Sequence, residues 1–171
     1  MRIPITLIAA AGIVMMTWTA MGQGKTKNLR ARLSGYQEVP AVSTEGSGEF
    51  RGRIDPRDTE MAYDLSYSGL RGNVTQAHIH FANSGTNGPI MIWLCGTATN
   101  PGPAGTPACP QQGTVSRTIT AADVVGPAGQ GIPPGDFAQA LDAIRAGAAY
   151  VNVHSTQWPG GEIRGQINEE R

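Results

Sequence analysis

Charge, cysteine and histidine are all scarce in this chain of 171 residues. Lys and Arg together number 13, as do Asp and Glu, so the formal net charge is zero. No cluster of basic residues breaks this balance, and nucleic acid is therefore not an expected partner. The sequence also lacks a Ser/His/Asp set, a carboxylate pair at helical spacing and a phosphate-binding loop. These absences favour a non-enzymatic protein without deciding the question.

Long apolar stretches are missing too, except at the N-terminus. Arg2 is followed by uncharged, largely apolar residues 3–21, and positions 20–22 offer small residues to a signal peptidase. This pattern predicts a signal peptide over residues 1–22. Its length approaches that of a membrane span, so an uncleaved N-terminal anchor is the alternative. Both interpretations place the domain outside the cytoplasm, periplasmic or secreted, and a membrane is a partner only if the segment is retained.

Cys95 and Cys109 are the only cysteines of the chain. They bracket a stretch rich in Gly, Pro, Thr and Ala that cannot pack a core of its own. In an oxidising compartment, a disulfide between them is the default expectation. Closing a loop of about 15 residues stabilises a fold by roughly 3 kcal/mol. Metal thiolates are the weaker alternative, because the spacing is unlike C-x-x-C.

Glycine and proline, in contrast, are abundant, with 23 and 12 residues. This much turn chemistry suits short strands joined by loops. Alternating patterns between the turns predict eight strands. They cover residues 29–33, 49–54, 59–67, 74–81, 90–95, 114–119, 149–155 and 162–167. Such a series predicts an all-β sandwich or barrel.

One helix interrupts the strands. Asp136 is a good N-cap with Gln139 three residues further on. Phe137, Leu141 and Ile144 then recur at helical spacing. We expect this helix to cover an open end of the β-structure and to carry no chemistry.

The only histidines, His78, His80 and His154, all belong to two predicted strands of matching polarity. His78 and His80 are two residues apart, which puts both imidazoles on one face of their strand. His154 lies on the polar face of its own strand. If the two strands are neighbours, three imidazoles can converge on the outer face of the sheet, where loops can shield them. Solvated or locally hydrogen-bonded histidines are the alternative.

Three histidines without a carboxylate at ligand spacing can hold zinc or copper. Imidazole suits both metals, and neutral histidine is available near pH 7. Copper binds nitrogen ligands more tightly in the general affinity order. We therefore expect copper, with zinc as the less favoured alternative.

Arg164 lies on the polar face of the last predicted strand, between Glu162 and Gln166. This position favours a surface arginine paired with Glu162 or with another acid. The functional alternative is a guanidinium near the histidines that attracts a small anion.

Several segments form a set that recurs in a known family. They are Leu33-Ser34-Gly35, Glu38-Val39-Pro40, Ala77-His78-Ile79-His80, Gly88-Pro89-Ile90, the run from Ala149 to His154 and the run from Pro159 to Ile167. On these segments the chain resembles the CHRD domain family, named for its occurrence in chordin and found widely in exported bacterial proteins. The resemblance implies a CHRD-like β-sandwich domain over residues 29–168. It also implies an extracellular module whose partner is another exported protein. The chain departs from the family at Ser155, where Thr is frequent, and in its long Cys-bracketed loop.

A more distant similarity is to copper/zinc superoxide dismutases, which are Greek-key sandwiches. Their H-x-H strand, late copper histidine and nearby arginine correspond in order to His78, His80, His154 and Arg164. A dismutase of that type has a fourth copper histidine that bridges to zinc, and this chain has no histidine left for it. The similarity implies a Greek-key β-sandwich and a mononuclear copper site. Copper binding, a metal-free interaction module and dismutase-like activity, with Arg164 as a catalytic candidate, all stay open.

Overall fold

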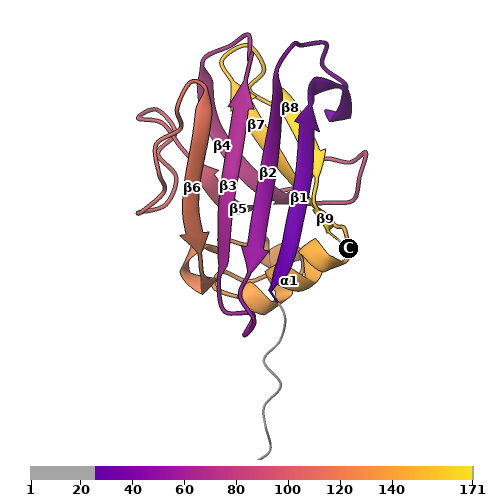
Figure 1. The fold of residues 1–171 in the computed structure, drawn as a ribbon, viewed down its shortest axis with the longest axis vertical. Helices are drawn as coiled ribbons and strands as arrows, with labels where there is room; N and C mark the ends of the chain where they lie inside the picture. The colour runs from indigo at the N-terminus through magenta and orange to yellow at the C-terminus, as the bar shows by residue number, and fades with distance from the viewer. Residues whose placement is uncertain (1–25, 171) are drawn as a thin grey trace, which may run out of the picture.

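The computed structural model describes residues 26–170, and the predicted signal peptide lies outside them. This part of the chain forms a curved, nine-stranded antiparallel sheet and one α-helix, with three short 3-10 turns (Figure 1). The strands are β1 (Lys27–Ser34), β2 (Ser47–Ile54), β3 (Met61–Ser68), β4 (Val74–Phe81), β5 (Ile90–Cys95), β6 (Gly113–Ile119), β7 (Ala149–Ser155), β8 (Ile163–Gln166) and β9 (Asn168–Glu169). The predicted all-β class is confirmed.

The sheet folds into two layers that face each other. The strand order is β5-β4-β7-β8-β1-β2-β3-β6, and β9 pairs with β1. In Figure 1, β1, β2, β3 and β6 form the front layer, and β4, β5, β7 and β8 lie behind them. The chain passes between the layers after β3, β5 and β6, which is the crossing pattern of a Greek-key sandwich.

The hydrophobic core lies between the two layers. One face of β3 contributes Met61, Tyr63, Leu65 and Tyr67 to this core, and all four are buried. Burying one large apolar side chain stabilises a fold by about 1.5–3 kcal/mol. The predicted bounds of β4, β5 and β7 are those of the structure. The two-residue β9 was not predicted, because it is too short to show a pattern.

Helix α1 (Phe137–Arg145) closes one end of the sandwich (Figure 1). The Asp136 side chain accepts a hydrogen bond from the Gln139 amide at 3.1 Å, as the sequence predicts. Phe137, Leu141 and Ile144 are buried against the strands. Among the described residues, no helix is both long and apolar enough to span a membrane.

The two cysteines are joined in a disulfide with their Cα atoms 5.0 Å apart. Two backbone hydrogen bonds, from Gly96 N to Pro107 O and from Cys109 N to Gly96 O, hold the ends of the enclosed loop together. The loop folds back over Trp93 of β5. A Cβ added at Gly102 would lie 2.7 Å from Cε3 of the Trp93 ring, so only glycine permits this close approach.

Candidate metal centre

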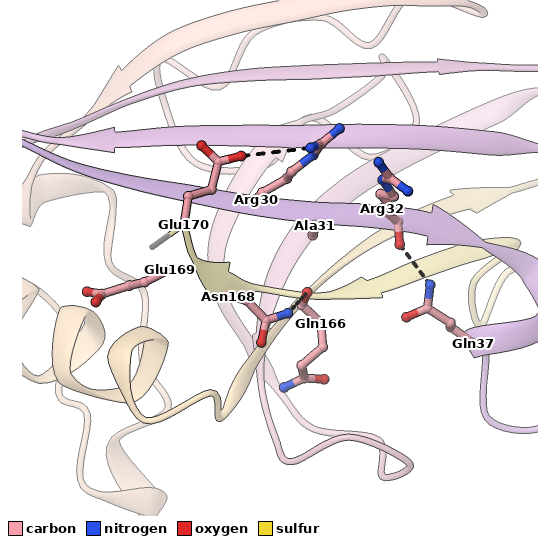
Figure 2. Close-up of a pocket in the computed structure, with 8 residues that line it drawn as sticks. All are labelled: Arg30, Ala31, Arg32, Gln37, Gln166, Asn168, Glu169 and Glu170. Atoms are coloured by element: carbon pink, nitrogen blue, oxygen red, sulfur yellow. Dashed lines mark hydrogen bonds and ion pairs between the residues drawn. The ribbon is translucent and has the colours of Figure 1, made fainter.

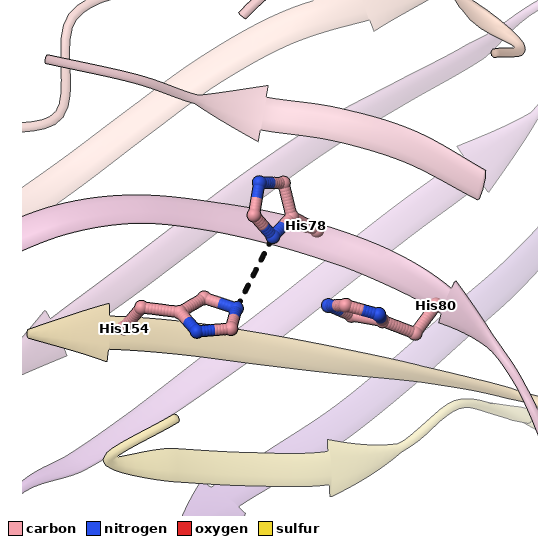
Figure 3. A group of neighbouring side chains, drawn as sticks. All are labelled: His78, His80 and His154. Atoms are coloured by element: carbon pink, nitrogen blue, oxygen red, sulfur yellow. Dashed lines mark hydrogen bonds between the residues drawn. The ribbon is translucent and has the colours of Figure 1, made fainter. Parts of the chain in front are cut away.

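The three histidines meet on the outer face of the sheet. β4 pairs with β7, so His78 and His80 lie beside His154 (Figure 3). One ring nitrogen of each lies within 4.8 Å of the others. Their exposed fractions are 0%, 7% and 6% for His78, His80 and His154. The two strands are thus neighbours, and the cluster is covered by loops.

Two covering loops fix how the imidazoles are protonated. Nδ1 of His80 is 2.9 Å from the Gly88 carbonyl, and Nδ1 of His154 is 2.9 Å from the Pro159 carbonyl. A carbonyl oxygen only accepts hydrogen bonds, so both Nδ1 atoms carry a proton. In the neutral rings, Nε2 of both histidines therefore keeps a free lone pair.

His78 completes the set. Its Nδ1 is 3.1 Å from Nε2 of His154, drawn as the dashed line in Figure 3. Because Nε2 of His154 has the lone pair, Nδ1 of His78 is the donor. Nε2 of His80 and Nε2 of His78 are buried without a partner among the described residues. Buried polar atoms without partners are rare in folded proteins and call for an explanation.

Burial keeps all three rings neutral. It lowers the pKa of His78 to about 2 and that of His80 to about 4, and it also lowers the pKa of His154. A protonated imidazole in this cluster would be a positive charge removed from water with no counter-ion beside it, which disfavours the protonated form. Neutral imidazole is the form that binds metal ions, so the rings are held ready as ligands at pH 7.

Aromatic side chains wall the cluster on two sides. Trp93 lies opposite His78 in the β4–β5 pairing, and their ring centres are 4.3 Å apart at nearly a right angle. Tyr150 stacks on His80 with the ring centres 4.9 Å apart and an angle of 7° between the planes. The disulfide-enclosed loop packs on Trp93 and thereby supports the wall beside His78.

The prediction that Arg164 is a surface residue paired with Glu162 is wrong. Arg164 is only 2% exposed, and its Cζ lies 3.4 Å from the centre of the Tyr150 ring. Its guanidinium donates to the Thr86 carbonyl at 2.7 Å and to Asn87 Oδ1 at 3.2 Å. Strand alternation correctly placed Arg164 on the outer face but could not show that a loop covers this face.

Glu162 is engaged elsewhere. Its Oε1 accepts from the Thr44 hydroxyl and from the Arg71 amide, each at 2.7 Å. These bonds tie the segment before β8 to the loops after β1 and β3. Glu162 is therefore no partner of Arg164.

Sequence reasoning missed Glu38 and Asn152. Asn152 lies opposite His78 in the β4–β7 register, and its Nδ2 donates to Glu38 Oε1 and to the Ile163 carbonyl. Burial raises the pKa of Glu38 to about 7. The carboxyl lies beside a cleft of about 370 Å³ that Trp158 and Pro159 also line. The sequence singled out Glu38 only as part of the family segment Glu38-Val39-Pro40, and that segment does not indicate that the side chain is buried.

A larger groove of about 650 Å³ runs along β1, β8 and β9, away from the histidines (Figure 2). Arg30 pairs there with Glu170 at 3.9 Å, and Gln37 donates to the Arg32 carbonyl at 2.7 Å. Its polar groups thus largely engage one another. We assign this groove no chemistry.

The fold and the site define a disulfide-linked β-sandwich with a buried tri-histidine cluster on its outer face. A family model described as CHRD domain matches residues 29–167, and the chain belongs to that family. Comparison with curated proteins and with solved structures gives no match. CHRD domains are typically extracellular, and the disulfide agrees with a compartment other than the cytoplasm.

Proposed function

We propose that this CHRD domain is a periplasmic or secreted copper-binding module with a single site at His78, His80 and His154. The supporting observation is the lone pair on Nε2 of His80. It is buried, it has no partner among the described residues, and it belongs to a cluster of three neutral imidazoles. A bound metal ion would supply the missing partner.

The groups behind the ligand rings also suit a metal site. Histidines that bind metals usually donate their other ring N–H to a carbonyl or a carboxylate. His80 and His154 donate to carbonyls in this way. Nitrogens bound to one ion at about 2.0–2.1 Å lie roughly 3.3–3.6 Å apart. The 3.1 Å between His78 Nδ1 and His154 Nε2 is close to that value, so binding through these two atoms requires a small shift of the rings and transfer of the His78 proton from Nδ1 to Nε2.

Copper is favoured over zinc by the donor set. The cluster offers imidazole alone, and copper binds nitrogen ligands more tightly than zinc does. When bound, copper supplies a one-electron redox centre. The protein's own residues hold the ligand rings in place, exclude bulk water and keep the imidazoles neutral.

Equilibrium dialysis against Cu(I), Cu(II) and Zn(II), followed by metal analysis, tests this proposal. We expect one copper per wild-type chain and none in the H78A/H80A/H154A variant. His80→Gln, which keeps most of the side-chain volume, should weaken copper binding at least tenfold. Arg51→Gln, on the solvated face of β2, is the control and should bind like wild type.

Equal copper binding by wild type and both histidine variants would refute the copper proposal and leave the metal-free interaction module. Dismutase-like activity is a separate outcome. It requires copper-loaded protein to remove superoxide faster than the metal-free protein does.

A further inference from the structure

A buried positive charge lies one aromatic ring away from the histidine cluster. Tyr150 contacts the Arg164 guanidinium and also stacks on His80. This follows from the sheet, in which β7 carries Tyr150 and runs between β4 and β8. The hydrogen bonds of the guanidinium go to uncharged groups of the loop after β4. Arg164 therefore keeps its full charge beside the site.

The acidic side chains nearby compensate this charge poorly. Among the described residues, no carboxylate lies within 4.0 Å of the Arg164 guanidinium. Glu38 is the acid whose charge acts on Arg164, but burial raises its pKa to about 7, so it is partly protonated at neutral pH. Glu162 is committed to Thr44 and to backbone amides.

We propose that Arg164 makes the tri-histidine site discriminate by ionic charge, holding Cu(I) in preference to Cu(II) and Zn(II). This inference rests on the proposed copper site. All three ligands are neutral, so a bound ion keeps its whole charge in a site shielded from water. The desolvation cost of an ion rises with the square of its charge, and a dication is repelled by Arg164 twice as strongly as a monocation.

The size of the effect follows from Coulomb's law. Two unit charges on the order of 10 Å apart, at an effective dielectric constant of about 20, change a binding constant roughly tenfold. The extra charge of Cu(II) over Cu(I) is one unit. For a one-electron couple, a tenfold change in the ratio of binding constants equals about 59 mV.

The test compares wild type with Arg164→Gln, Arg164→Lys and Glu38→Gln in the full chain. Binding constants for Cu(I) and Cu(II) come from competition with chelators, and the midpoint potential of the copper-loaded protein from a redox titration. Arg164→Gln removes the charge, so the Cu(I)/Cu(II) preference should fall roughly tenfold and the potential by about 59 mV. Arg164→Lys keeps the charge and should restore most of the wild-type preference.

Glu38→Gln keeps the inference testable if Arg164→Gln does not fold. It removes the remaining negative charge, so the preference for Cu(I) should rise. An unchanged preference in Arg164→Gln, or equal shifts in the Gln and Lys variants of Arg164, would overturn the inference while leaving copper binding intact. Full copper binding by every histidine variant would instead overturn the proposed function.

Discussion

The two layers of the sandwich treat their outer faces in opposite ways. In β3, of the front layer, buried residues alternate with more exposed ones, so its outer face meets solvent. In β7, of the rear layer, all seven residues are buried. Both strands place apolar side chains in the same core. They differ because loops cover the outside of β7 and leave the outside of β3 open.

This difference decides how a polar side chain affects the free energy of folding in each layer. On the solvated face, Arg30 and Arg51 pair with Glu49, and such surface pairs contribute about 0–1 kcal/mol each. On the covered face, every polar group that loses water needs a partner inside the protein. Asn152 and Arg164 have such partners, whereas Nε2 of His80 has none among the described residues. The chemistry of the molecule is therefore expected on the covered face.

The loop between β7 and β8, which helps to cover the outer face of β7, provides the largest expected effect on stability. A Cβ at Gly161 would lie 2.6 Å from the Asn152 amide and 2.7 Å from Glu38 Oε1, and Gly161 has a φ of +132°. Gly161→Ala should lower the free energy of unfolding by about 3 kcal/mol, since it adds backbone strain and overpacking. Gly160→Ala is the matched control, because a Cβ added there would meet nothing within 4 Å. Urea unfolding of both variants measures the difference, and equal stabilities would show that the cover is loosely packed.

Much of this architecture was predictable from period-two alternation. It gave the bounds of β4, β5 and β7 and put the histidines on one face. Alternation compares the two faces of one strand and contains no information about the loops above them. For that reason it assigned Arg164 to the surface and gave no role to Glu38 or Asn152. Their contacts join segments far apart in the chain, since Glu38 and Asn152 are separated by 114 positions.

Acid should destabilise the covered face of the metal-free protein. His80 has an ordinary pKa of 6.5 and a pKa of about 4 in the fold, so between these values the unfolded chain binds a proton that the folded chain does not. Stability therefore falls as the pH drops from 7 to 5, and His80 contributes about 2 kcal/mol of this loss. Urea unfolding at the two pH values measures it, and His80→Gln should reduce the loss.

Glu38 acts in the opposite direction. Its pKa of about 7 in the fold exceeds its ordinary value of 4.5, so the folded protein takes up a proton in this interval and gains stability as the pH falls. Glu38→Gln removes this compensation and should steepen the loss between pH 7 and pH 5. A loss of stability that neither substitution changes would contradict the burial of both groups.

The smallest effect compares one outward polar residue from each layer. Asn152→Ala leaves the Glu38 carboxyl and the Ile163 carbonyl without their donor and should cost about 1–2 kcal/mol. Ser66→Ala, on the solvated side of β3, removes a long hydrogen bond of 3.4 Å and should cost less than about 0.5 kcal/mol. The free energies of unfolding in urea, at pH 7, give both values.

A double-mutant cycle then shows whether the cost at Asn152 comes from burial. If the covered face desolvates Glu38, the combined Glu38→Ala and Asn152→Ala variant should lose less stability than the two single losses added, because no carboxyl is left unpaired. Strict additivity would mean that water reaches Glu38. The outer faces of β7 and β3 would then differ in shape, but on neither face would a polar side chain need a hydrogen-bond partner inside the protein.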